Sequence, residues 1–209
     1  QKETDYDYCL VNLYLENEAY RNYFLEASQQ GREIILDNAA FELPEAISGE
    51  VYLSVIKALK PNYVIIPDVL GDSIKTITSC MEFLSQYKDQ IDAKLIGVVH
   101  GDNYCSLAQC YRWYQYLKID KIAIPFHSPA YLKSHPSDNL LASQSNGRRK
   151  FIDRLSKEEF FNSEIPLHLL GCSVMSEFST YANRERYGYI ESLDTSNPIV
   201  AGLKNFRYN

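Results

Sequence analysis

Three aspartates and one histidine stand where hydrophobic segments of the chain end, and these residue types can do chemistry there. They are Asp37, Asp68, His100 and Asp194. In parallel α/β proteins the carboxyl ends of the strands meet at one rim, where loops supply catalytic groups and apolar walls strengthen each charge. Carboxylates and an imidazole gathered at such a rim predict acid–base or nucleophilic catalysis.

Taken singly, each aspartate is more simply explained as a helix cap or a turn residue. The residues around Asp37 and Asp68 favour a functional role instead. Asp37 precedes the small residues Asn38, Ala39 and Ala40, which let a ligand approach the backbone closely. Asp72 is the better cap for the next helix, which leaves Asp68 for another task. Asp194 lies in a Thr-Ser-Asn-Pro context that also fits an ordinary turn.

The elements that must position these residues follow from hydrophobic patterning. Continuous apolar runs predict strands buried on both faces, at 9–15, 33–37, 63–68, 94–101, 121–126, 167–172 and 189–194. Apolar residues spaced three or four apart predict helices between them, at 17–30, 45–59, 73–87, 104–117, 148–161 and 174–186. In the first helix Asn17 caps the start and Gly31 closes the end.

Strict alternation of strands and helices predicts an α/β fold with a parallel sheet. We expect a single domain over residues 1–209, built as a compact or truncated TIM-type (β/α)8 barrel with its active site at the C-terminal rim. The chain has 209 residues, whereas such barrels usually need about 250. The eighth unit is therefore uncertain, and 199–203 predicts either a last strand or the start of a helix.

Composition predicts a soluble cytoplasmic protein. No apolar stretch approaches the roughly 20 residues of a membrane span, and the N-terminus lacks the order of a signal peptide. The five cysteines are scattered, and no C-x-x-C occurs, so we expect reduced packing residues and no metal site. We also expect no membrane partner.

The net charge of −6 does not indicate a nucleic-acid binder, but one region is basic. Between residues 133 and 157, five Lys and Arg residues and one His follow Lys133 against only two aspartates. We predict a long rim loop over 128–147, because that stretch is rich in Ser, Pro and Asn. On charge alone, the basic residues after it read as a solvated helix start.

Six short motifs, in order, resemble those of the tRNA-guanine transglycosylases and of their DNA-acting relatives in phages and bacteria, which insert 7-deazaguanines. They are LDNAAFE (36–42), PDVLGD (67–72), GVVHGD (97–102), AIPF (123–126), LHLLG (167–171) and YGYIESLDTSNP (187–198). In the family, the first motif is typically an Asp followed by Ser-Gly-Gly-Phe-Gln, and the nucleophile lies four residues before a proline. Asp194 and Pro198 keep that spacing.

The resemblance implies base exchange, replacing guanine by a 7-deazaguanine in a polynucleotide through a covalent glycosyl-aspartate intermediate. Asp194 would be the nucleophile and Asp37 the general acid or base. Asp68 would bind the Watson–Crick edge of the purine, and His100 would stand where the family has a base-binding Gln. The neighbouring Asn38, Ala39, Phe41 and Gly101 would complete the base pocket, and Arg148, Arg149 and Lys150 would contact nucleic acid.

This chemistry is physically consistent. A carboxylate nucleophile divides glycosidic exchange into two displacements with oxocarbenium-like transition states. Clustered carboxylates repel one another, so at least one should have a raised pKa. The target base must leave its stack, which requires a pocket. The implied partners are a polynucleotide and a 7-deazaguanine base, without a cofactor.

Departures from the family pattern affect the substrate. Asn38-Ala39-Ala40 replaces Ser-Gly-Gly, which narrows the space for the base, and His100 replaces Gln, which changes the donors and acceptors offered to it. The tRNA-acting members carry a C-terminal cysteine-rich zinc site and a basic surface. Neither is visible in this sequence, which favours DNA over tRNA. Such enzymes often pair, which leaves a homodimer or a partner subunit open.

Other function classes stay open. A catalytically silent transglycosylase-like subunit would bind nucleic acid, although the presence of both Asp37 and Asp194 argues against silence. A metal-dependent barrel hydrolase would use Asp37, His100, His168 and Asp194 as ligands, but His168 is expected near the start of its strand, at the wrong end for a ligand. A small-molecule-binding barrel without transfer activity also fits the fold.

Overall fold

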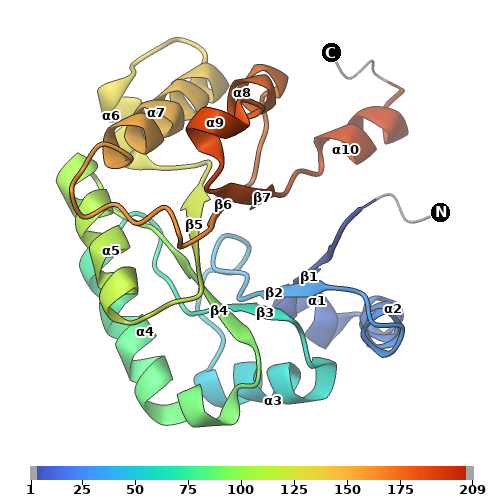
Figure 1. Cartoon of the computed structure of the whole chain (residues 1–209). Coiled ribbons are helices and arrows are strands. Elements are labelled where there is room, and N and C mark those ends of the chain that lie inside the picture. The colour runs from blue at the N-terminus through green and yellow to red at the C-terminus, as the bar shows by residue number, and fades with distance from the viewer. Residues whose placement is uncertain (1–3, 206–209) are drawn as a thin grey trace. The chain divides into compact units, whose positions relative to one another are not determined.

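The computed structural model describes residues 4–205 and contains parallel strands connected by helices (Figure 1). The strands are β1 (Asp7–Leu10), β2 (Ile34–Asp37), β3 (Tyr63–Ile65), β4 (Lys94–Val98), β5 (Lys121–Pro125), β6 (Leu167–Leu170) and β7 (Ile190–Leu193). The helices are α1 (Val11–Glu16), α2 (Glu18–Gln29), α3 (Gly49–Leu59), α4 (Ser73–Tyr87), the 3-10 helix η1 (Lys88–Gln90), α5 (Tyr104–Tyr116), α6 (Pro129–Ser134), α7 (Leu140–Leu155), α8 (Met175–Tyr181), α9 (Arg184–Tyr187) and α10 (Asn197–Leu203).

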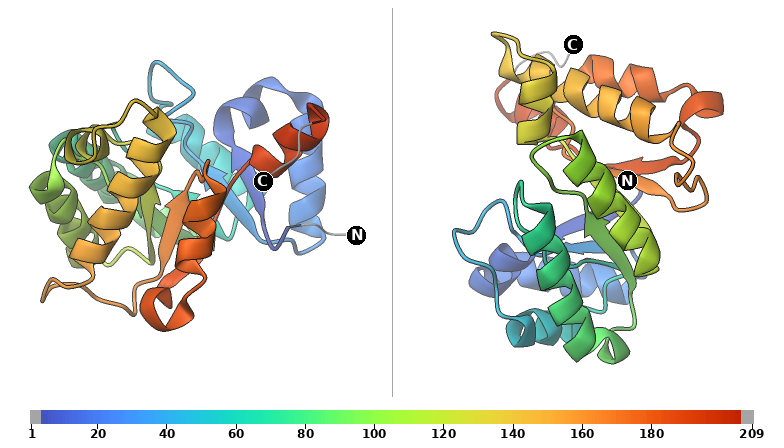
Figure 2. Two further views of the ribbon diagram at one scale, coloured as in Figure 1. Left: turned by 90° about the horizontal axis from the view of Figure 1, so that it is seen from above. Right: turned by 90° about the vertical axis from the view of Figure 1, so that its left-hand side faces the viewer.

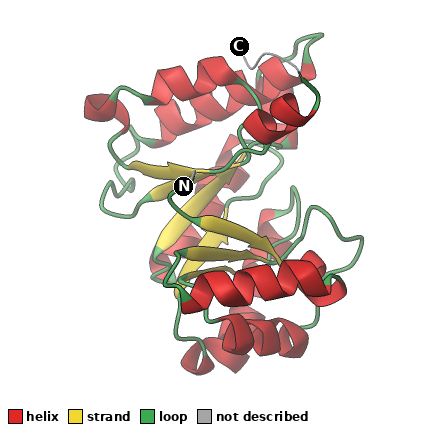
Figure 3. Ribbon diagram, turned by 90° about the vertical axis from the view of Figure 1, so that its right-hand side faces the viewer, coloured by secondary structure: helices red, strands yellow, loops and turns green. Residues whose placement is uncertain are grey.

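The described chain divides into two compact units. The first contains residues 4–70 and 74–97, and the second contains 71–73 and 98–205. In each unit, strands alternate with helices (Figure 3). The prediction of an α/β fold with parallel strands is confirmed, whereas a single domain over the whole chain stays a prediction.

In the first unit the strands stand in chain order, and each pairs in parallel with the next. The register places Leu10 of β1 opposite Asp37, the last residue of β2, and Leu36 opposite Val64 of β3. Every residue of β2 and β3 is buried, as expected for parallel strands covered on both faces. Parallel pairing brings the carboxyl ends of these strands to one edge, so residues that end them come together there.

The second unit repeats this arrangement with β5, β6 and β7, which are also parallel and in chain order. The β6–β7 register is irregular: Leu167 pairs with Ile190, whereas His168 already pairs with Ser192. One residue of β7, Glu191, is thus passed over. The shift brings His168 opposite Ser192 and places Leu169 opposite Leu193, immediately before Asp194.

Local capping explains where most helices begin. Asn17, Asn139 and Asn183 each accept a backbone N–H at the start of α2, α7 and α9, and Ser48 does so for α3. At α5 the Asn103 and Ser106 side chains form a reciprocal capping box. The predicted helix 17–30 and its Asn17 cap are confirmed, as are the helices predicted at 73–87 and 104–117.

The predicted first strand, 9–15, is wrong over most of its length. Only Cys9 and Leu10 belong to β1, and helix α1 begins at Val11. In α1 the buried residues are Val11 and Tyr14, three positions apart, so burial is confined to one face of a helical turn. The apolar run alone did not separate a strand from a short helix.

The predicted rim loop over 128–147 is also wrong, because α6 and α7 occupy most of that range. Ser128 accepts a backbone N–H and Pro129 follows at the first helical position, which is a helix-start signal. The polar residues Ser143, Gln144 and Ser145 are buried, and Gly147 packs directly on Tyr131. Small polar residues here allow close helix packing, and α6 and α7 lie side by side in Figure 2.

Two other predicted segments differ less from the observed helices. The predicted helix 174–186 is interrupted at Ala182 and Asn183 and forms α8 and α9. The segment 199–203 is helical and belongs to α10. Across residues 4–205, no helix is both long enough and apolar enough to cross a bilayer.

Gly147 gives a test of the α6–α7 packing. A Cβ at this position would lie 2.3 Å from the Tyr131 Cβ and 2.6 Å from its Cα. Gly147→Ala should therefore lower the free energy of unfolding by about 1–3 kcal/mol through overpacking. Gly202→Ala is the matched control, because the helical Gly202 has open space around it and alanine should be neutral or stabilising there. Urea unfolding of both variants measures this, and equal stabilities would contradict the packing interpretation.

Candidate active site

Asp37 ends strand β2 as a buried carboxyl that is hydrogen-bonded at both oxygens. Its Oδ1 accepts the backbone N–H of Ala39 at 2.5 Å, and its Oδ2 accepts the Tyr8 hydroxyl from β1. The pairing of β1 with β2 brings Tyr8 to this edge. The carboxyl is therefore held in one orientation.

The electrostatic environment of Asp37 favours its protonated form. Burial raises the pKa of Asp37 to about 7, and the charges of Asp68 and Glu42 add to the rise, whereas the hydrogen bonds from Tyr8 and Ala39 oppose it. The expectation that one clustered carboxyl has a raised pKa is consistent with Asp37. A carboxyl that titrates near neutrality can both give and take a proton at physiological pH.

Asn38 connects Asp37 to Asp68. The Asn38 side-chain amide donates to Asp68 Oδ1 at 2.6 Å and to the Ile66 carbonyl at 2.9 Å, while its Oδ1 accepts the N–H of Ala40. The exits of β2 and β3 are thus joined by one side chain, and the buried carboxylate of Asp68 is oriented. The first unit brings Asp37, Asn38 and Asp68 together, as the sequence predicted.

Ala39 and Phe41 shape the same loop differently. Ala39 is buried and has a φ of +59°, the left-handed region that normally favours glycine. This conformation turns its N–H back onto Asp37. Phe41 is 66% exposed, and its ring is thus accessible for stacking against a planar ligand.

In the second unit, Asp194 directly follows β7 and is held through one oxygen. Its Oδ1 accepts the N–H of Gly171 at 2.7 Å and lies 3.2 Å from His168 Nε2. Within the described residues, Oδ2 accepts no hydrogen bond, and the side chain is 25% exposed. One carboxylate oxygen is therefore fixed by the protein while the other is available to react.

Sequence reasoning missed His168 as a partner of Asp194. From its place in the sequence, His168 was expected near the start of its strand, far from Asp194. In the structure the imidazole is fully buried: Nδ1 lies 2.9 Å from Ser192 Oγ, and Nε2 lies 3.2 Å from Asp194 Oδ1. The register shift between β6 and β7 brings these side chains into line. Residues two apart on a strand point to the same face, as His168 and Leu170 do in β6 and as Ser192 and Asp194 do at the end of β7. This spacing was the only sign in the sequence that His168 and Asp194 could meet.

The loop after β7 is tied to the loop after β6. The Thr195 hydroxyl donates to the Cys172 carbonyl at 2.6 Å, and the Asn197 side-chain amide donates to the Ser173 carbonyl at 2.9 Å. Gly171, whose φ is +67°, begins the β6 loop. These bonds fix the backbone that follows Asp194 to the loop after β6.

His100 and Gly101 follow β4 in the second unit. The buried His100 accepts the N–H of Gly71 at Nδ1 over 3.3 Å, which leaves Nε2 as the protonated nitrogen of the neutral ring. Gly101 is explained by packing, because a Cβ there would lie 2.4 Å from Ser106 Oγ and 2.7 Å from Leu107 N, at the start of α5.

The predicted nucleic-acid contact at Arg148 is corrected. Arg148 is 0% exposed and forms an ion pair with the equally buried Glu177, at 2.7 Å. Its Nη1 donates to the carbonyls at the ends of β5 and β6, and its Nη2 to Cys172 Sγ. The guanidinium also lies 5.0 Å from the centre of the Phe126 ring. The buried guanidinium is therefore inaccessible to a phosphate in solution.

Arg149 and Lys150, by contrast, are exposed on α7. Their predicted contact with nucleic acid stays a prediction. Among residues 4–205, no group of three or more His, Cys, Asp or Glu side chains is arranged to hold a metal ion.

No protein-family model and no curated protein matches this sequence. The functional inference therefore rests on the residues and their geometry.

Asp37 should make stability depend on pH. Because its pKa is raised from 3.8 to about 7, the folded state binds more protons than the unfolded state between these values. The stabilisation is complete below about pH 4 and is lost as pH rises to about 7, with a slope of up to about 1.4 kcal/mol per pH unit. Asp37→Asn should remove this slope in urea unfolding from pH 4 to 8. Parallel curves for the two proteins would contradict the raised pKa.

The buried ion pair predicts a contrast between neighbouring arginines. Arg148→Met should cost about 3–5 kcal/mol of unfolding free energy, because it leaves Glu177 buried without its partner. Arg149→Met, at an exposed site, should change it by less than about 0.5 kcal/mol. The double variant Arg148→Met/Glu177→Met should recover much of the loss. Chemical denaturation measures all three, and equal effects of the two single variants would show that Arg148 is not buried as described.

Proposed function

We propose that this protein is a base-exchange transglycosylase that replaces guanine by a 7-deazaguanine in a polynucleotide, DNA rather than tRNA. The observation that carries the proposal is that each unit holds one carboxyl at a strand end, in a different environment. Asp194 is anchored through one oxygen with the other unengaged among the described residues, while burial raises the pKa of Asp37 to about 7. Glycosyl transfer with retention needs one carboxylate as nucleophile and a second as proton carrier.

Asp194 serves as the nucleophile. Its Oδ2 attacks C1′ of the target nucleotide and forms a glycosyl–aspartate ester, while the C1′–N9 bond breaks and guanine leaves. The incoming base then attacks C1′ from the opposite face and releases the carboxylate. The N–H of Gly171 holds Oδ1, and the imidazole of His168 lies 3.2 Å from it, so that the reacting oxygen keeps its direction.

Asp37 carries the proton between the two displacements. In its protonated form it gives a proton to the departing guanine, and the resulting carboxylate takes one from the incoming deazaguanine. A pKa near 7 suits both directions at neutral pH. The Tyr8 hydroxyl stabilises the ionised form that exists between these transfers.

Asp68 and its neighbours recognise the base. Asp68, oriented by the Asn38 amide, accepts hydrogen bonds from the purine N–H groups. The exposed ring of Phe41 provides a surface on which the extruded base stacks. His100, which follows β4, takes the place of the base-binding Gln of the family that the sequence resembles. Arg149 and Lys150 contact the phosphates of the strand. The parallel α/β architecture is that of a shortened TIM-type barrel.

The proposal predicts a covalent adduct that depends on Asp194. Purified protein is incubated with guanine-containing DNA or with tRNA, with and without a 7-deazaguanine base, then denatured and analysed by intact mass. The wild-type protein should form an adduct with DNA that the added base discharges. Asp194→Asn should reduce adduct formation at least about 10³-fold, because an amide is not a nucleophile for this step.

Asp92→Asn is the matched control, because Asp92 is an exposed aspartate outside the proposed site and should leave adduct formation unchanged. An adduct on tRNA alone would reverse the choice of polymer. The absence of an adduct and of base exchange with either polymer would overturn the transglycosylase proposal.

A further inference from the structure

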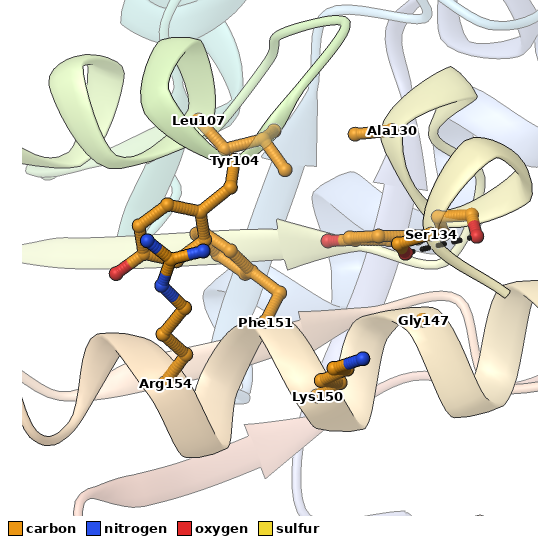
Figure 4. Close-up of a pocket in the computed structure, with 9 residues that line it drawn as sticks. Tyr104, Leu107, Ala130, Ser134, Gly147, Lys150, Phe151 and Arg154 are labelled. Carbon is orange, nitrogen blue, oxygen red and sulfur yellow. Dashed lines mark hydrogen bonds between the residues drawn. The ribbon is translucent and has the colours of Figure 1, made fainter.

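A cavity lies within the second unit, between helices α5, α6 and α7 (Figure 4). Its volume is about 160 Å³, and its lining includes Tyr104, Tyr131, Gly147, Lys150, Phe151 and Arg154. None of Asp37, Asp68, His100 and Asp194 lines it. The cavity is therefore distinct from the proposed catalytic residues.

Aromatic rings form much of the wall. The Tyr104 and Phe151 centroids are 5.8 Å apart, and those of Tyr131 and Phe151 are 6.2 Å apart. The Arg154 guanidinium lies 3.5 Å from the centre of the Tyr104 ring, and Figure 4 shows Tyr104, Phe151 and Arg154 at one end of the cavity. Such walls favour a flat, unsaturated ligand.

Two cationic side chains, Lys150 and Arg154, line the cavity. Lys150 is exposed, and within the described residues it forms no ion pair, so its ammonium is available to an anion. Arg154 is also exposed and lies 3.9 Å from Glu158, a loose contact. Figure 4 shows Lys150 and Ser134 at the end opposite Tyr104. A ligand that fits this cavity would therefore have a negatively charged group separate from its flat ring.

Tyr131 adds a polar requirement. It is 1% exposed, it lines the cavity, and its hydroxyl has no hydrogen-bond partner among residues 4–205. A buried hydroxyl without a partner is unfavourable, and a ligand with a hydrogen-bonding edge would relieve it. A nucleobase has such an edge, whereas a plain phenyl ring does not.

The size of the cavity narrows the choice of base. A protein cavity of about 150 Å³ accepts one benzene-sized ring, so the space here suits a six-membered base better than a fused purine. We propose that this cavity binds a pyrimidine nucleotide, with the ring between the aromatic walls and against the Tyr131 hydroxyl, and the phosphate on Lys150. The proposal does not rest on base exchange, because binding can be measured without any reaction.

Calorimetric titration tests this, with cytidine 5′-monophosphate as the probe and cytidine, inorganic phosphate and guanosine 5′-monophosphate for comparison. The pyrimidine nucleotide should bind at least about ten-fold more tightly than each of the others, because only it satisfies both ring and phosphate contacts. Lys150→Ala should weaken its binding about ten-fold and Tyr131→Phe about three- to five-fold. Lys157→Ala, at an exposed cation that does not line the cavity, should change it less than about two-fold.

A short oligodeoxycytidine distinguishes the two sources of the nucleotide. Tighter binding of the oligomer, displaced by the free mononucleotide, would identify a single strand as the occupant, whereas binding of the mononucleotide alone would identify a free metabolite. Failure of the mononucleotide to bind, or equal binding by the Lys150→Ala variant, would overturn the proposal. Thermal unfolding of each variant verifies that it is folded, and a negative result here leaves the covalent-adduct experiment unaffected.

Discussion

The buried ion pair between Arg148 and Glu177 is the interaction on which the second unit most depends. Both side chains are fully shielded from water, a situation that is tolerated when the two charges are paired and hydrogen-bonded. The pair fixes α7 to α8, and the same guanidinium donates to the carbonyl of Gly171. Because the N–H of Gly171 holds Asp194, the buried cation also helps to determine where the Asp194 carboxylate lies. Core packing and the position of the site are therefore coupled through a single glycine.

The first unit uses burial in the opposite sense. There, no cation is among the main groups that shift the pKa of Asp37. Its hydrogen bonds with Tyr8 and Ala39 only partly offset the loss of hydration that raises this pKa. The protein thus keeps one acid close to its point of half-protonation, while it anchors another by direct hydrogen bonding at Asp194. The two environments suit proton transfer and nucleophilic attack respectively.

The sequence predicted those features that local patterning controls. Asp37 and Asp194 were placed correctly at the ends of strands, because an apolar run that stops at an acidic residue is a local signal. Arg148 was assigned to the surface by its charge, since its partner Glu177 lies 29 residues further along the chain. His168 was missed because its contact with Asp194 depends on the irregular pairing of two strands. Long-range partners and strand register are set by tertiary packing, which composition and periodicity do not encode directly.

The backbone at Ala39 has a consequence for how the first loop moves. A residue with a side chain in the left-handed region holds about 1–2 kcal/mol of strain that glycine would not, yet its methyl group also excludes many conformations that glycine would sample. The loop after β2, whose Asn38 is hydrogen-bonded to Asp68, therefore samples fewer conformations in the absence of a ligand. Alanine at this position lowers the free energy of unfolding, but it also reduces the conformational entropy that the loop would lose when a ligand binds. A single methyl group therefore preorganises this edge of the sheet.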